Sequence, residues 1–98
     1  MKIILDDRRT FPDGPYNCVR TYDDCIRLLR IFGKASFLSL DYDLGAEKTG
    51  LDVLIYMHEN GIAAEKINIH SDHSEGVPKM RRYAEENFPK ALLTFNQL

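Results

Sequence analysis

The stretch FLSLDYD, residues 37–43, is a short apolar run that ends abruptly in a small polar cluster. The same pattern occurs twice more, in KIILDD at residues 2–7 and in KINIHSDH at residues 66–73. Each run is followed by a loop, and after the runs at 37–43 and 66–73 a helical pattern comes next, which is typical of a parallel α/β sheet. Ligands of such sheets bind beyond the carboxyl ends of the strands. The polar clusters are therefore expected to meet at one edge, where the functional site should lie.

The segments between these runs carry sequence signals for loops and helices. Pro12, Gly14 and Pro15 break any helix in residues 8–16, which are therefore expected to form a loop. Helices are expected where a capping residue precedes apolar positions at helical spacing. The expected strands cover residues 2–6, 17–21, 36–41, 66–70 and 91–95, and the expected helices begin near Asp23, Thr49 and Pro78.

These elements predict a single α/β domain over residues 1–98 with a flavodoxin-like parallel sheet of five strands. Parallel neighbours need right-handed crossovers, and the strand order 2-1-3-4-5 satisfies that rule. Two helices of the doubly wound plan are missing, one between the first two strands and one after the last. Both would cover the same face of the sheet, so one face should be covered by helices and the other should be more open.

The strands carry the pattern that such a half-covered sheet requires. One set of strand positions is apolar, whereas the alternate set includes Ser39 and Asn68. We expect the loop of residues 8–16 to cover part of the open face and Phe37 to be partly exposed there. Exposed apolar patches often mark interaction surfaces, so a homodimer or a docked partner on this face is a prediction.

Composition narrows the classes of function. With 44% hydrophobic and 29% charged residues, the chain is an ordinary globular domain, and it has no apolar run long enough to span a membrane. A strand begins at once, which argues against a signal peptide. Cys18 and Cys25 sit among apolar residues, which favours free thiols in the cytoplasm. The net charge of −2, without a basic stripe, makes long nucleic acids improbable partners but leaves a phosphorylated small molecule or a nucleic-acid end open.

Asp6, Asp7 and Asp41 are the candidate metal ligands. Two neighbouring strands end at these residues, so their carboxylates should lie close together and repel one another unless a cation neutralises them. Ligands that are all oxygen suit divalent cations such as Mg²⁺ or Mn²⁺. The alternative is that these residues only end strands and begin turns, as acidic residues often do.

The cluster after the fourth strand adds acid–base and phosphate chemistry. An imidazole can move protons near neutral pH, which makes His70 the candidate general acid or base, and His73 a further candidate. Ser71 can donate a hydrogen bond to a phosphoryl oxygen. Arg9 has the shape for bidentate phosphate contact, although it could instead pair with a nearby aspartate on the surface.

With these residues assembled, the chain resembles the receiver domains of two-component signalling, and more closely the cyclic-phosphate processing receiver-like family. The resemblance covers nearly the whole chain. It rests on LDDRR at residues 5–9, SLDYDLG at 39–45, Thr49-Gly50 and IHS at 69–71, together with Gly76 and Met80. It implies a receiver-like fold without the first helix and a role in processing cyclic phosphate ends, expected in RNA repair. It also implies catalytic Asp41 and His70, phosphate contacts from Arg9, Ser71 and Thr49, and further roles for Asp43 or His73.

Two departures from the family patterns shape the functional hypothesis. Receivers carry a Lys at the end of the fifth strand, whereas this chain has Thr94-Phe95-Asn96-Gln97, and where the family often has Asn this chain has His73. Without that Lys, ordinary phosphorelay is disfavoured. The leading hypothesis is a metal-dependent phosphoesterase or phosphate-binding enzyme. The alternatives are a degenerate receiver without turnover and a binding module that uses the open sheet face.

Overall fold

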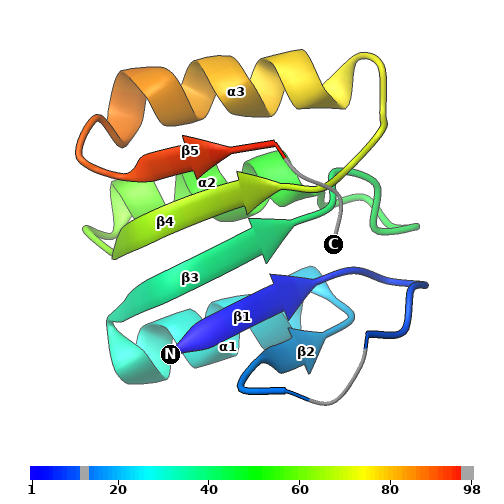
Figure 1. Ribbon diagram of the computed structural model, residues 1–98, viewed down its shortest axis with the longest axis horizontal. Helices are drawn as coiled ribbons and strands as arrows, with labels where there is room; N and C mark the ends of the chain where they lie inside the picture. The colour runs from blue at the N-terminus through cyan, green and yellow to red at the C-terminus, as the bar shows by residue number, and fades with distance from the viewer. Residues whose placement is uncertain (12–13, 96–98) are drawn as a thin grey trace.

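The computed structural model describes residues 1–11 and 14–95. A parallel sheet of five strands in the order β2-β1-β3-β4-β5 forms its centre (Figure 1). The elements, in chain order, are β1 (Lys2–Leu5), β2 (Asn17–Val19), α1 (Tyr22–Phe32), β3 (Lys34–Leu40), α2 (Gly50–Glu59), β4 (Ala63–Ile69), α3 (Gly76–Asn87) and β5 (Leu92–Thr94). The predicted flavodoxin-like class, strand order and direction are all confirmed.

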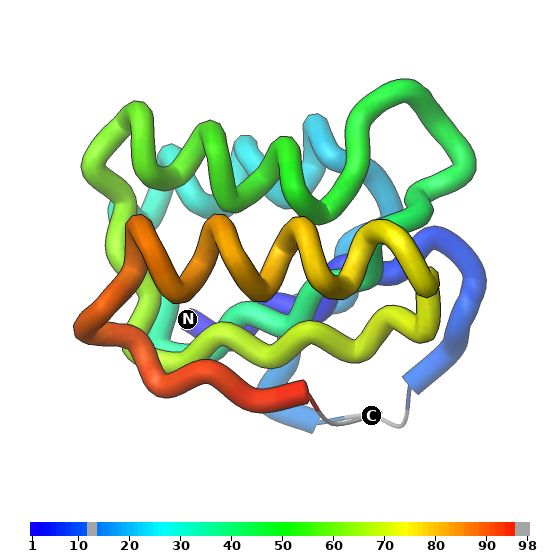
Figure 2. The backbone as a smooth tube through the Cα atoms, turned by 90° about the horizontal axis from the view of Figure 1, so that it is seen from above, coloured from blue at the N-terminus to red at the C-terminus, as the bar shows by residue number. Residues whose placement is uncertain are grey.

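The three helices lie on one face of the sheet, and the other face carries none in the described residues (Figure 2). The described part of the β1–β2 connection, which includes 7–11 and 14–16, contains no helix, as expected for a receiver-like fold without its first one. Residues 12–13 of that loop and 96–98 after β5 lie outside the described residues. No helix in the described part of the chain is long and apolar enough to cross a membrane.

The hydrophobic core lies between the sheet and the helices. Parallel register places Ile3, Leu38 and Ile67 in one row across β1, β3 and β4, and all three are completely buried. Leu29 of α1 and Leu54 of α2 pack in the same core. Truncating a buried Leu or Ile to Ala typically costs about 2–5 kcal/mol of stability. The packing of this row therefore fixes the strands, and so their carboxyl ends, relative to one another.

The opposite face carries the alternate strand residues. Ile4, Ser39, Asn68 and Thr94 occupy one row across β1, β3, β4 and β5. Phe37, one step toward the amino ends, is half-buried and lies against the ring of Tyr16 with the centroids 5.7 Å apart. The expected partial exposure of Phe37 is thus confirmed, whereas Ser39 and Asn68 prove to be almost fully buried.

Local sequence signals set the helix ends. Thr21 caps α1 by accepting a hydrogen bond from the backbone N–H of Asp24 at 3.1 Å, and the helix ends at Gly33, whose φ of 73° favours glycine. The backbone N–H of Thr49 donates to the carboxylate of Asp52 at 2.8 Å at the start of α2. These caps place the first turns of α1 and α2 at the carboxyl edge of the sheet.

Candidate functional site

Three strands deliver one polar side chain each to the carboxyl edge. Asp6, Asp41 and His70 come directly after β1, β3 and β4, and each offers a ligand atom within 4.8 Å of the others. Backbone hydrogen bonds continue the sheet to this level, because the amide of Asp41 donates to Leu5 at 3.0 Å and that of His70 donates to Leu40 at 3.1 Å. The predicted meeting of the strand-end clusters therefore occurs, and the sheet itself fixes its geometry.

Asp6 is the most strongly held of the three. Its Oδ1 accepts hydrogen bonds from the backbone amides of Arg8 and Arg9, at 3.0 and 2.9 Å. Its Oδ2 lies 3.1 Å from Nε2 of His70 and 3.6 Å from Nε of Arg9. Burial favours the neutral acid, but the bonds from the Arg9 and Arg8 amides and from His70 outweigh it and lower the pKa of Asp6 below its usual value. Asp6 is therefore a carboxylate at neutral pH.

His70 is held from both sides. Its side chain is fully buried, with Nε2 facing Asp6 and Nδ1 lying 2.7 Å from the hydroxyl of Ser39. Burial lowers the pKa of His70, although the hydrogen bond to Asp6 and the charge of that carboxylate oppose the shift. Since an ionised Asp6 needs a donor, the ring proton of neutral His70 belongs on Nε2, and Ser39 donates to Nδ1.

The hydrogen bonds continue across the open face of the sheet as one polar chain, defined here as Thr94, Asn68, Ser39, His70 and Asp6. The hydroxyl of Thr94 donates to Oδ1 of Asn68 at 2.6 Å, and Nδ2 of Asn68 donates to the hydroxyl oxygen of Ser39 at 3.0 Å. The donors of these bonds thus meet acceptors, so a polar path runs from the partly exposed Thr94 on the edge strand β5, through the buried Asn68, Ser39 and His70, to the carboxylate of Asp6.

Asp41 stands in a different electrostatic state from Asp6. Burial raises the pKa of Asp41, and the negative charge of Asp6 adds to that effect, whereas a hydrogen bond from the Ser71 hydroxyl opposes it. The backbone around Asp41 is closely packed, because a Cβ on Gly50 would lie only 2.1 Å from the Asp41 carbonyl oxygen. The pKa values of the two carboxyl groups are therefore shifted in opposite directions, which the sequence could not show. Hydrogen-bond donors stabilise the charge of Asp6, whereas burial and Asp6 disfavour the charge of Asp41.

A pocket of about 230 Å³ opens in front of these groups. It is lined by Asp6, Arg8, Arg9, Asp41, Asp43, His70, Ser71, Asp72 and His73. The lining holds four carboxylates against two guanidinium groups, so its net charge is −2 when both histidines are neutral. The pocket thus contains the predicted Arg9, Ser71, Asp43 and His73 beside the predicted Asp41 and His70.

Two of the predicted site residues lie elsewhere. Asp7 does not line the pocket; its Oδ1 is buried without a hydrogen-bond partner and lies 3.9 Å from Nε of Arg8. Thr49 also lies outside the lining, and its hydroxyl is 3.2 Å from the carboxylate of Asp52 in the first turn of α2. The phosphate contact expected from Thr49 and the metal contact expected from Asp7 stay predictions.

Several residues that shape the site were not singled out in the sequence. Phe11 packs edge-on to the ring of His70, with centroids 6.1 Å apart, and the guanidinium of Arg9 stacks over Phe11 at 5.4 Å. Arg20 donates to the backbone carbonyls of Asp6 and Arg9 and so ties β2 to the loop after β1. Ser39 and Asn68 do give a signal, since both are polar on otherwise apolar strands, but that pattern alone indicates an open face and not a buried hydrogen-bonded pair.

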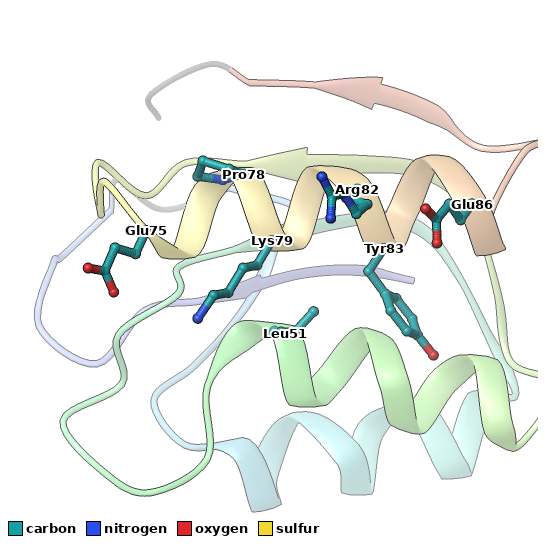
Figure 3. A pocket seen from close by; sticks show the side chains of 7 residues that line it. All are labelled: Leu51, Glu75, Pro78, Lys79, Arg82, Tyr83 and Glu86. Atoms are coloured by element: carbon teal, nitrogen blue, oxygen red, sulfur yellow. The ribbon is translucent and has the colours of Figure 1, made fainter.

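A larger hollow of about 490 Å³ lies between α2 and α3, where Lys79 and Tyr83 extend toward Leu51 (Figure 3). It shares no residue with the strand-end pocket. Among the described residues, Asp6, Asp41 and His70 alone form a group of side chains that could hold a metal ion. The chemistry therefore points to the smaller pocket at the strand ends.

Comparisons with known proteins identify the family. No curated protein and no solved structure matches the chain. The model of the cyclic-phosphate processing receiver domain matches residues 1–86, which includes every residue of the strand-end pocket. The chain therefore belongs to the family of cyclic-phosphate processing receiver domains.

Proposed function

We propose that this protein is a phosphoesterase that uses a divalent cation to act on a small cyclic or terminal phosphate, such as the cyclic end of an RNA. The observation that carries the proposal is the convergence of Asp6, Asp41 and His70 within 4.8 Å in a pocket that also contains Arg9. Membership of a cyclic-phosphate processing family supports the substrate class.

The donor set fits a divalent cation. Carboxylate oxygens suit Mg²⁺ or Mn²⁺, and the net charge of the pocket is −2, which one such ion would neutralise. Asp7 adds a buried carboxylate oxygen that accepts no hydrogen bond next to this edge. Asp6 and Asp41 would hold the ion, whereas Asp7 lies outside the pocket lining and would have to turn toward the ion to add a further oxygen. Bound there, the ion would polarise a phosphoryl group and could lower the pKa of a water.

The protein's own side chains would bind and orient the phosphate. Arg9 lies within 3.6 Å of Asp6 and stacks on Phe11, so its guanidinium is held at the pocket with its position fixed by two contacts. Arg8 lines the same wall. A fixed donor in the pocket stabilises charge that develops on phosphoryl oxygens in the transition state, without reorganisation at the moment of reaction.

His70 would act through Asp6 in the state described here. Its two ring nitrogens face Asp6 and Ser39, so it keeps Asp6 oriented and ionised. The general acid–base role expected from the sequence needs Nε2 to exchange Asp6 for the substrate or a water. That role remains part of the proposal, and the effect of His70 substitutions on kcat measures it.

The size of the pocket supports a small substrate group. Its volume of about 230 Å³ is below the range of roughly 300–1,000 Å³ that encloses drug-sized ligands. A phosphate with its attached sugar is the kind of group that such a hollow receives, and the remainder of a nucleotide or chain would lie outside. The substrate is then recognised by its phosphate end rather than by its base.

The test is a screen of phosphoesters that includes 2′,3′-cyclic nucleotides, linear nucleoside monophosphates and p-nitrophenyl phosphate, with Mg²⁺, Mn²⁺ or EDTA. We expect cation-dependent turnover of at least one phosphoester, lost by about 10²-fold or more in Asp41→Asn. Asp23→Asn removes the same charge from the exposed first turn of α1 and should leave turnover unchanged. No turnover of any substrate with either metal would contradict the proposal.

A further inference from the structure

We propose that His73 is a fixed N–H donor that binds a phosphoryl oxygen in the strand-end pocket. This inference rests on the proposed function for the nature of the ligand. It assigns to His73 the role of a hydrogen-bond donor rather than of a metal ligand or a proton carrier. Three sets of contacts carry it: one at Nδ1, one at the ring face and one along the backbone.

The contact at Nδ1 decides where the ring proton sits. The backbone N–H of Gly76, in the first turn of α3, donates to Nδ1 of His73 at 2.9 Å. A nitrogen that accepts from an amide cannot carry a proton of its own, so in the neutral ring the proton is on Nε2. With Nδ1 occupied by the Gly76 amide, Nε2 is the ring nitrogen that is left to donate.

The ring face is held by Tyr42. The two ring centroids lie 4.7 Å apart at an angle of 43°. Tyr42 in turn packs on Gly76 so closely that a Cβ there would lie 2.2 Å from Cγ of the tyrosine ring. Because Gly76 has no side chain, Tyr42 can pack against it and against the ring of His73. The amide of Gly76 can at the same time donate to Nδ1 of His73.

The backbone of His73 is fixed as well. Its amide donates to the hydroxyl of Ser71 at 3.2 Å, and its carbonyl accepts from the amide of Val77 at 3.1 Å as α3 begins. Ser71 also donates to Asp41, so the position of His73 is linked to the carboxylate beside it. Orientation of the ring is thus settled before any ligand arrives, which reduces the entropy lost on binding.

Nε2 is the one polar group of this ring without a hydrogen-bond partner among the described residues, and His73 lines the pocket that holds Asp6, Asp41 and Arg9. A protonated Nε2 cannot ligate a metal, since a metal ligand needs the bare nitrogen lone pair. It can donate to an oxyanion. The neutral Nε2–H tautomer adds no positive charge to the pocket, so its donation does not repel a cation bound to the nearby carboxylates. A phosphoryl oxygen is the acceptor that this combination suits.

The first experiment observes the tautomer directly. Long-range ¹H–¹⁵N spectra of the uniformly labelled protein distinguish protonated from bare imidazole nitrogens, and His73→Asn identifies the His73 signals by their loss. We expect the Nε2–H tautomer at neutral pH, and a shift of the Nε2 signal when inorganic phosphate is added with Mg²⁺. The Nδ1–H tautomer, or an Nε2 signal unmoved by saturating phosphate, would overturn the proposal.

The second experiment separates the donor from the ring. His73→Phe keeps an aromatic ring to stack on Tyr42 but removes the N–H, whereas His73→Asn restores a side-chain N–H donor. We expect the dissociation constant of inorganic phosphate with Mg²⁺, measured by calorimetry, to rise about tenfold in His73→Phe. His73→Asn should stay within about threefold of the wild type. His58→Phe is the control, because His58 packs between Tyr83 and Phe88 outside the pocket and should leave phosphate binding unchanged.

The two proposals can fail separately. If phosphate binds and shifts the His73 signal but no phosphoester is turned over, the donor role of His73 stands and the enzymatic proposal falls. If phosphoesters are turned over but His73→Phe binds phosphate as tightly as the wild type, the donor role is wrong. Failure of the wild type to bind inorganic phosphate in the presence of Mg²⁺ would also overturn it.

Discussion

His70 and Asp6 are 64 positions apart in the sequence, yet Nε2 of the imidazole lies 3.1 Å from Oδ2 of the carboxylate. The contact joins the end of β4 to the end of β1 across the intervening strand β3. Both side chains are almost completely buried, at 1% and 2% exposure. Neither partner can therefore be removed without leaving the other buried and incompletely paired, which is typically costly.

This contact predicts how stability depends on pH. Burial lowers the pKa of His70 below its unfolded value of about 6.5, so the folded state prefers the neutral ring. The stability gained is fully present above that unfolded pKa and is lost as the pH falls below it. The free energy of unfolding, measured by urea denaturation, should decrease from pH 7 to pH 5, and His70→Gln should flatten the decrease. Equal slopes in His70→Gln and the wild type would contradict this.

The cation site predicts a thermal shift. Mg²⁺ or Mn²⁺ at a hundred times its dissociation constant should add about 2.7 kcal/mol, or roughly 10 °C or more in Tm for a domain of this size. Asp41→Asn should remove most of that response, whereas the exposed Asp23→Asn should keep it. A melting curve unchanged at millimolar concentrations of both metals would count against the site.

The raised pKa of Asp41 also predicts that Asp41→Asn has opposite effects on stability with and without metal. The pKa of Asp41 is raised by burial and by Asp6, so its ionisation costs stability as the pH rises through that raised pKa. Asp41→Asn should therefore stabilise the metal-free protein at pH 7 while it weakens the response to metal. In the wild type the metal response should fade as the pH drops toward the pKa of Asp41, because protons then compete for the carboxylate. Calorimetric scans with EDTA and with Mg²⁺ measure both effects.

Ser39 provides a test of the polar chain. Ser39→Ala removes the hydroxyl that accepts from Nδ2 of Asn68 and leaves Nδ1 of His70 without the donor described here, and all three residues are buried. An unsatisfied buried polar group costs about 1–3 kcal/mol, and urea denaturation should show a loss of this size. Ser74→Ala, in the exposed loop before α3, should change stability by no more than about 0.5 kcal/mol. A loss below that level in Ser39→Ala would show that the chain is not a stabilising unit.

Gly50 tests whether the packing around Asp41 matters to the site. An added Cβ would meet the Asp41 carbonyl oxygen at 2.1 Å and Cε of Met80 at 2.9 Å, so Gly50→Ala must displace Asp41. We expect a loss of about 1–3 kcal/mol and a weaker response to Mg²⁺, although no ligand is removed. Val53→Ala destabilises the same helix at a fully buried position without adding an atom against Asp41, and it should keep the metal response. A normal response in Gly50→Ala would mean that the site tolerates movement of Asp41.

The sequence alone predicted the strand order, because apolar runs that end in polar residues mark both the strands and their carboxyl ends. Boundaries moved by a few residues: β3 begins at Lys34 rather than at residue 36, and α3 begins at Gly76 before Pro78. The meeting of Asp6 with Asp41 and His70 followed from strand order, because neighbours in a parallel sheet end at the same edge. The contacts that follow from strand order, such as those among Asp6, Asp41 and His70 at the carboxyl edge, were therefore predictable from the sequence.

The state of each site residue was not predictable. The sequence places His70 at a strand end and gives no sign of its burial, but the structure buries it against Ser39 and Phe11. Periodicity shows which face a residue occupies, and it cannot show what a loop such as residues 8–16 places over that face. Opposite pKa shifts at Asp6 and Asp41 likewise arise from individual amide and hydroxyl donors, which only three-dimensional geometry supplies.

The polar chain from Thr94 to Asp6 also determines how the strands can align during folding. A slip of one residue between β3 and β4 would turn Asn68 into the apolar core and separate it from Ser39, because side chains alternate between the two faces. Any misaligned sheet would thus bury unpaired polar groups and lose the pairing of His70 with Asp6. The polar chain consequently destabilises non-native registers. Folding of the sheet in its native register therefore also assembles the site.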